Sequence, residues 1–165
     1  MKRIITAIVF IGGMASFANA ADGVLSQKNL SFDLADKLAQ SALRACSAGN
    51  YNVAVTVVDR AGTPLVIKRM DNAGPHTVDA SRMKAFTALT TRNATENVMK
   101  SAQGNVEATN LRDIPGFLLL AGGVPVKSGD VVIGAIGVGG APGGHLDQQC
   151  ALDALKNNQS DLDAG

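Results

Sequence analysis

The stretch GAIGVGGAPGGHLDQQC, residues 134–150, decides between two fold classes. A glycine-rich turn between a strand-like and a helix-like segment is typical of a phosphate-binding loop, and the glycine spacing from Gly139 to Gly144 fits its first part. Such a loop needs a lysine after its last glycine, but His145 follows Gly144. The dinucleotide-binding pattern fails as well, because Pro142 occupies its third glycine position. We therefore expect no nucleotide cofactor.

Outward from this stretch, strand-like segments occur in runs joined by tight turns, with helix-like segments between the runs. Residues 131–138 are apolar on both faces, which predicts a central, covered strand, and Gly134 and Gly137 within it indicate close approach of a backbone or helix. The order α-β-β-α-α-β-β-β-α predicts an α+β fold, a central antiparallel sheet of about five strands flanked by helices. The expected strands are 51–59, 64–70, 117–121, 124–127 and 131–138, and the expected helices are 30–48, 78–92, 94–102 and 145–157.

The first twenty residues have the pattern of a secretory signal peptide. Met1-Lys2-Arg3 is cationic, residues 4–14 are almost entirely apolar, and Ala18-Asn19-Ala20 has the small-x-small pattern of a cleavage site. The apolar segment is too short for a membrane span. An uncleaved anchor or a buried first helix is the alternative. We expect cleavage after Ala20, a single domain over residues 21–165, and a periplasmic or secreted location.

Composition excludes one class of partner. The formal net charge is +1 and aromatic residues make up 4% of the chain, so neither a basic stripe nor a set of stacking platforms for nucleic acid is present. With 46% hydrophobic residues and no low-complexity tract, the chain has the composition of an ordinary globular domain. We expect no nucleic-acid partner.

The two cysteines lie on apolar stripes of the first and last expected helices. The stripes have a spacing of four residues, with Leu34, Leu38, Ala42 and Cys46 in the first and Leu146, Cys150 and Ala154 in the second. Such stripes face a core, and thiols that meet in an exported protein usually oxidise. Two readings stay open, a Cys46–Cys150 disulfide or two inert buried thiols, because the sequence does not give the Cα separation that a bridge requires.

Two histidines are the candidate metal ligands. His145 lies in the first turn of a helix, where the helix dipole disfavours the imidazolium form and leaves the neutral imidazole that binds metal. It is a metal or haem-iron ligand or a residue that helps to cap the helix. His76 lies on a loop that Gly74 and Pro75 constrain. On the following helix, Arg82 and Lys84 either meet an anionic group or are simply solvated.

Five short motifs follow one another in the order seen in the GlcG/HbpS family, the haem-binding or haem-degrading domain family, which the chain resembles over residues 27–157. They are Val55-Thr56-Val57-Val58-Asp59 with Gly62, Arg69-Met70-Asp71, Ser81 with Lys84-Ala85, Gly122-Gly123-Val124-Pro125, and Gly134-Ala135-Ile136-Gly137-Val138. The resemblance implies a profilin-like fold and homo-oligomers. An exported member of that family is an octamer that binds haem and works beside a membrane sensor.

The resemblance implies that haem is the ligand here. One axial ligand is then His, Met, Tyr or Lys, with Arg or Lys on the propionates. We prefer His76 as axial ligand because Arg82 and Lys84 are close to it in sequence, with His145 as the alternative. A membrane sensor is a possible partner in this reading. The second hypothesis is an accessory protein or small-molecule enzyme of organic-acid or alcohol metabolism, as suggested by the glycolate- and corrinoid-linked relatives.

Other site patterns are incomplete. Asp147-Gln148-Gln149-Cys150 lacks the second carboxylate of the D/E-x-x-E iron motif that some exported relatives carry, which argues against a free-iron site of hard oxygen ligands. Ser81-Arg82-Met83-Lys84 has the Ser-x-x-Lys spacing of serine acyl-transfer enzymes without their other elements. A binding protein is therefore favoured over an enzyme, and haem degradation stays open.

Overall fold

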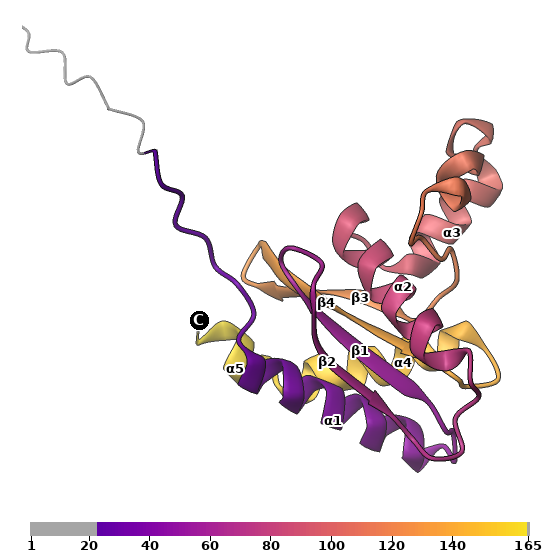
Figure 1. The fold of residues 1–165 in the computed structure, drawn as a ribbon, viewed down its shortest axis with the longest axis horizontal. Coiled ribbons are helices and arrows are strands. Elements are labelled where there is room, and N and C mark those ends of the chain that lie inside the picture. Colours follow the sequence, from indigo (N-terminus) through magenta and orange to yellow (C-terminus); the bar gives the residue numbers. More distant parts are fainter. Residues whose placement is uncertain (1–22, 165) are drawn as a thin grey trace, which may run out of the picture.

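The computed structural model describes residues 23–164, in which a four-stranded antiparallel sheet carries helices on both faces (Figure 1). The elements in chain order are α1 (Phe32–Ala48), β1 (Ala54–Asp59), β2 (Pro64–Arg69), α2 (Thr77–Thr91), α3 (Thr95–Gly104), the 3-10 helix η1 (Val106–Asp113), β3 (Gly123–Ser128), β4 (Val131–Gly139), α4 (Gly144–Asn157) and α5 (Gln159–Asp163). No helix within residues 23–164 has the length and apolar character needed to cross a bilayer. The predicted signal peptide and its cleavage site lie outside the described residues.

The sheet has the strand order β2-β1-β4-β3, and all neighbouring strands are antiparallel. The two central strands pair with Thr56 opposite Gly137, and both are almost wholly buried. Helices α1 and α4 cover one face, while α2 packs on the other face against β1, β3 and β4 (Figure 1). The predicted α+β class is confirmed, and so is the central position of the strand at 131–138.

Helix α1 forms because its sequence supplies a start signal and one apolar face. The Ser31 side chain accepts a hydrogen bond from the Leu34 amide at 3.3 Å, and Asp33 in the first turn complements the positive end of the helix dipole. The helix ends where the Gly49 amide donates to the Cys46 carbonyl. Burying a leucine such as Leu38 contributes about 2 kcal/mol. The buried face consists of Ala35, Leu38, Ala39, Ser41, Ala42 and Cys46.

Helix α2 lies close to the sheet because glycine faces it. A Cβ on Gly137 of β4 would overlap the Ser81 carbonyl oxygen, so this strand position admits a helix backbone only without a side chain. Beside this contact, the Thr56 and Ser81 hydroxyls form a buried hydrogen bond of 2.8 Å. The close helix approach predicted from Gly137 is confirmed.

The sheet has four strands rather than about five, because residues 117–121 do not pair with it. The Phe117 ring packs edge-on against Phe86 of α2, with ring centroids 6.2 Å apart. The Leu118 amide donates to the Thr87 hydroxyl at 2.9 Å. This apolar segment thus satisfies its packing and part of its backbone hydrogen bonding on α2 and does not add a strand.

Of the two readings for the cysteines, the disulfide between α1 and α4 is the one the structure contains. Cys46 and Cys150 are bonded, with their Cα atoms 5.4 Å apart, which lies in the ordinary range for such bridges. Both residues belong to the main apolar core between the sheet and these two helices. The bridge joins segments 104 residues apart and fixes the two helices of this layer to each other.

The molecule has two distinct ends along the strands. We call one the glycine end: the end of β4 with the loop that follows it (138–144), the segment that leads into β3 (121–123), and the first turns of α2 and α4. We call the other the hairpin end: the turns at 60–63 and 129–130 and the last turn of α2. The antiparallel register places the two at opposite ends of the central strands, because Ala54 pairs with Gly139 while Asp59 pairs with Gly134.

Candidate functional site

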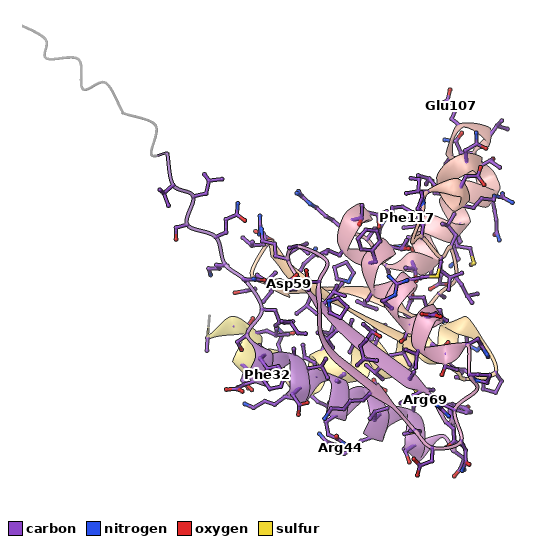
Figure 2. The ribbon with its side chains drawn as sticks, viewed as in Figure 1. Phe32, Arg44, Asp59, Arg69, Glu107 and Phe117 are labelled. Carbon is purple, nitrogen blue, oxygen red and sulfur yellow. A yellow bond between two sulfur atoms is a disulfide. The ribbon has the colours of Figure 1, made fainter. Side chains whose placement is uncertain are left out.

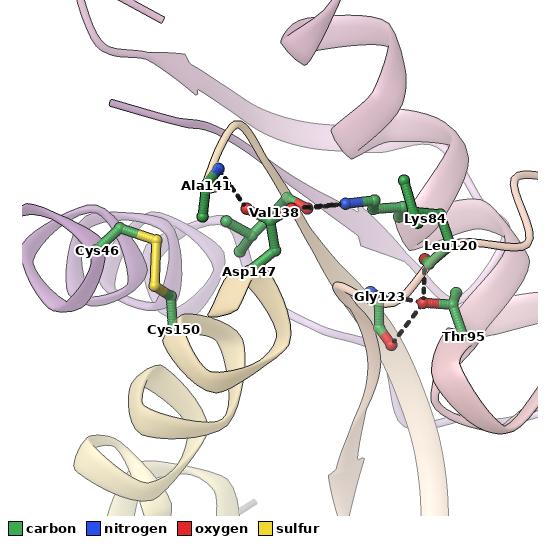
Figure 3. A network of polar contacts seen from close by, with 9 residues as sticks. All are labelled: Cys46, Lys84, Thr95, Leu120, Gly123, Val138, Ala141, Asp147 and Cys150. Atoms are coloured by element: carbon green, nitrogen blue, oxygen red, sulfur yellow. Dashed lines mark hydrogen bonds and ion pairs between the residues drawn. A yellow bond between two sulfur atoms is a disulfide. The ribbon is translucent and has the colours of Figure 1, made fainter. Parts of the chain in front are cut away.

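A buried ion pair closes the glycine end. The Lys84 ammonium of α2 donates to the Asp147 carboxylate of α4 at 2.8 Å and to the Val138 carbonyl at 2.9 Å (Figure 3). The other Asp147 oxygen accepts from the Ala141 amide at 2.9 Å. Only 1% of the Lys84 side chain and 4% of the Asp147 side chain are exposed. Because α2 and α4 lie on opposite faces, this pair connects the two helical layers past the end of β4.

Glycines make room for this pair. Gly122 has a φ of +127°, and a Cβ there would lie 2.8 Å from the Lys84 ammonium. A Cβ on Gly123 would overlap the Lys84 carbonyl oxygen. The Gly123 amide donates to the Thr95 hydroxyl at 2.9 Å, and this hydroxyl donates to the Leu120 carbonyl at 2.8 Å (Figure 3). The backbone of the segment before β3 is therefore held against α3 by the Thr95 hydroxyl and lies close to the backbone of α2 at Lys84.

His76 lies at the start of α2 with an exposed side chain. Arg69 holds the loop that carries His76, because its guanidinium donates hydrogen bonds to the Ala73 and Asp71 carbonyls at 3.2 Å each. The Thr77 amide and hydroxyl both bind the Gly74 carbonyl. Within residues 23–164 the His76 imidazole has no hydrogen-bond partner. Its backbone is thus fixed while both ring nitrogens stay available.

A hollow of about 490 Å³ borders this loop. It lies between the second half of α1 and the residues that follow β2, and it ends at Asn72, four residues before His76. Leu43 and Met70 supply its apolar surface, Arg44 and Arg69 supply positive charge, and Asp71 supplies one carboxylate. Figure 2 shows these two arginines at the end of the molecule opposite Asp59.

His145 has a different environment in the first turn of α4. Its side chain is exposed and lies near Glu96 of α3. The hydrogen bond from Lys100, 2.6 Å long, lowers the pKa of Glu96, and the hydrogen bond from Gln148 and the nearby His145 act in the same direction. Among the described residues, the Oε1 atom of Gln148 is buried without a partner. His145 thus belongs to a polar cluster between α3 and α4.

The structure separates the predicted site residues into two groups. His76 and Arg82 are accessible, since His76 is exposed and Arg82 half-buried, and His145 is exposed as well. Lys84 was expected on a ligand's anionic group or in solvent. It lies instead in the interior, with its ammonium taken by Asp147, and we therefore remove it from the ligand-contacting set.

Asp147 is the residue that the sequence analysis missed. It appeared only as half of an incomplete iron motif. A signal was present, because Asp147 precedes Cys150 by three residues and so lies on the same helix face as a core cysteine. A carboxylate on a core-facing stripe requires a buried partner, and Lys84 supplies it.

Comparison with known proteins identifies the family of this chain. The family model described as "Haem degrading protein HbpS-like" matches residues 30–156. The chain therefore belongs to the HbpS-like family.

Individual relatives agree with this assignment. A crystal structure of a double mutant of Streptomyces reticuli HbpS is 37% identical, with a TM-score of 0.78 over 88% of this chain and 98% of that one. Escherichia coli GlcG is 32% identical over 66% of this chain and 80% of its own length. A PduOC:haem complex has a TM-score of 0.71 over 78% of this chain and 94% of that one; at 24% identity it shows the shared fold alone.

Proposed function

We propose that this protein binds haem at the glycine end, with His76 as the axial ligand. The family description, which names haem degradation, supports haem as the ligand class. The observation that carries the site is the position of His76. It is an exposed imidazole without a protein partner, on an ordered loop that continues from an arginine-containing hollow. A neutral imidazole nitrogen is a common axial ligand of haem iron.

The hollow that borders the His76 loop has both apolar and cationic lining residues, which suits an amphipathic dianion. Haem has an apolar ring edge and two carboxylates, and the hollow offers apolar surface from Leu43 and Met70. Its charged lining residues, Arg44 and Arg69 against Asp71, leave one net positive charge. Guanidinium groups bind carboxylates through paired hydrogen bonds. Its volume of about 490 Å³ lies in the range of small-molecule sites. We assign the propionates to Arg44 and Arg69, with Arg82 as the additional candidate from sequence.

His145 is the weaker candidate for the same role. Its side chain lies beside the polar groups of Glu96, Lys100 and Gln148, whereas the hollow beside the His76 loop offers apolar surface from Leu43 and Met70. When bound, haem supplies a redox-active iron. The residues of this chain hold it, through the His76 imidazole and the arginine side chains.

Export and self-assembly belong to the same proposal. The Cys46–Cys150 disulfide favours an oxidising compartment, in agreement with the signal peptide expected at residues 1–20. We also propose a homo-oligomer. The arm formed by α3 and η1 projects from the body (Figure 1), no η1 side chain is buried, and Val106 is 90% exposed. Contact with a second copy of the chain covers these apolar atoms in this proposal.

A haemin titration followed at the Soret band tests the function. The wild-type protein is expected to give a saturable, stoichiometric spectral shift. His76→Ala is expected to weaken binding by at least about tenfold, while His145→Ala, the matched control at the start of the other helix, leaves it unchanged. The absence of a saturable shift under both oxidising and reducing conditions would contradict haem binding. Loss confined to His145→Ala would move the ligand to α4.

A further inference from the structure

A second hollow, of about 600 Å³, lies at the hairpin end. It is bounded by the last two turns of α2, by the turn after β1 and by the turn between β3 and β4. None of these segments contributes to the haem site proposed above. This hollow is therefore a separate candidate binding site.

Part of the lining of this hollow is apolar. Phe86, Leu89 and Val131 contribute side chains to it. The Phe86 ring is held in place, because Phe117 packs edge-on against it and a Cβ on Gly62 would lie 3.1 Å from the ring. A ligand that enters this hollow meets a fixed aromatic surface, so little ordering is required for binding.

The rim of the hollow carries two arginines and one carboxylate, Arg60, Arg92 and Asp130. The Arg60 guanidinium donates to the Val132 carbonyl at 3.1 Å, which anchors it and leaves its other N–H groups available. Within residues 23–164 the Arg92 guanidinium has no hydrogen-bond or ion-pair partner. Arg92 ends α2 in the left-handed region, with φ 53° and ψ 30°, a conformation uncommon for an arginine.

We propose that this hollow binds a small organic carboxylate with an aromatic or branched apolar body. The apolar part lies on Phe86 and Leu89, and the carboxylate accepts hydrogen bonds from Arg60 and Arg92, the geometry for which guanidinium is suited. Asp130 disfavours a dianion and selects a single negative charge. The lining contains no His, Cys, Met, Tyr or Lys, so it offers haem iron no axial ligand, and the site is separate from the proposed function.

Benzoate is the probe, and its neutral analogue benzamide is the matched control. Titration of the ¹⁵N-labelled protein with benzoate is expected to shift the backbone amide signals of residues 60–62, 86–92 and 130–132. These shifts are expected to give one common Kd, on the order of millimolar for so small a ligand. Benzamide is expected to bind at least about fivefold more weakly, because it cannot form charge-assisted hydrogen bonds. Equal binding of both compounds, or shifts confined to other residues, would overturn the proposal.

Two substitutions of opposite sign give the second test. Arg92→Gln is expected to weaken benzoate binding by about fivefold, and Asp130→Asn to strengthen it by about twofold, because each changes one charge beside the carboxylate. Arg112→Gln, on the exposed 3-10 helix η1, is the control and leaves the Kd unchanged. An unchanged Kd in Arg92→Gln would overturn the assignment. Haem binding by Arg92→Gln stays at the wild-type value, so failure here is distinguishable from failure of the haem proposal.

Discussion

The two ends of the sheet handle charge in opposite ways. At the glycine end, Lys84 and Asp147 are buried, bonded to each other and to backbone groups, and enclosed by glycines. At the hairpin end, Arg92 and Asp130 stand at the rim of an open hollow. A buried pair resists the loss of either partner, since the remaining charge stays out of water, whereas a rim charge is free to meet a ligand. The buried pair at the glycine end thus stabilises the fold, and the rim charges at the hairpin end stay accessible.

The largest expected effect separates these two roles directly. Asp147→Ala leaves the Lys84 ammonium buried without its carboxylate partner. This substitution is expected to lower the free energy of unfolding by about 3–5 kcal/mol. Asp130→Ala at the hairpin end is expected to change it by less than about 0.5 kcal/mol. Urea unfolding measures both. The double variant Lys84→Met/Asp147→Leu is expected to recover most of the loss, and a cost below about 1 kcal/mol for Asp147→Ala would show that the pair does not close this end.

The disulfide beside the glycine end ranks second. Replacing both Cys46 and Cys150 by alanine removes a cross-link between residues 104 positions apart. The free energy of unfolding is expected to fall by about 2–5 kcal/mol, because the unfolded chain gains conformational freedom. Reductant is expected to destabilise the wild-type protein by a similar amount and to leave the double variant unaffected. Equal sensitivity of both proteins to reductant would contradict this account.

Glycine substitutions sharpen the comparison at the level of the backbone. Gly137→Ala forces α2 away from β4, because the new methyl group meets the Ser81 carbonyl, and is expected to cost about 1–3 kcal/mol. Gly104→Ala, at the end of α3 where no atom lies within 4 Å of a built Cβ, is expected to be neutral or to stabilise by up to about 1 kcal/mol. Thermal unfolding of the two variants distinguishes these outcomes. Similar melting temperatures would argue against a close helix approach at Gly137.

The smallest effect concerns Glu96. The hydrogen bond from Lys100 holds the pKa of Glu96 below its ordinary value of 4.5, so Lys100→Ala is expected to raise this pKa toward 4.5. The pKa of Glu96 is lower in the folded than in the unfolded chain. The ionised carboxylate therefore stabilises the fold fully at pH values above the ordinary pKa of 4.5. This contribution is lost as the pH falls through the folded-state pKa. Carboxyl ¹³C NMR titration measures the shift, with Lys127→Ala on β3 as the control expected to leave it unchanged.

Local sequence patterns predicted most of the fold. The apolar stripes of four-residue spacing that contain Cys46 and Cys150 predicted the two helices and left a disulfide between them as one of two readings, which the structure bears out. The apolar strand at 131–138 predicted the centre of the sheet. The segment 117–121 was misjudged because β-strand and packed loop share the same apolar composition. Contacts with Phe86 and Thr87, some thirty residues earlier in the chain, decide the outcome.

The site residues were harder to predict from the sequence for the same physical reason, because their contacts join distant parts of the chain. Lys84 was assigned to a ligand because it is near His76 in the chain, but its partner Asp147 is 63 residues away. The hollow at the hairpin end combines Arg60, Arg92 and Asp130 from three separate segments, and no short motif encodes such a combination. Long-range pairing of charges is set by topology, and the sequence pattern gives this only in outline.

The measurement that tests the central claim most directly is one haemin titration applied to both ends of the molecule. His76→Ala and Arg92→Gln are compared with the wild-type protein through the Soret band. The account predicts at least about tenfold weaker haem binding for His76→Ala and wild-type binding for Arg92→Gln. Weaker binding for Arg92→Gln together with an unchanged affinity for His76→Ala would place haem at the hairpin end and contradict the division of roles argued for the two ends.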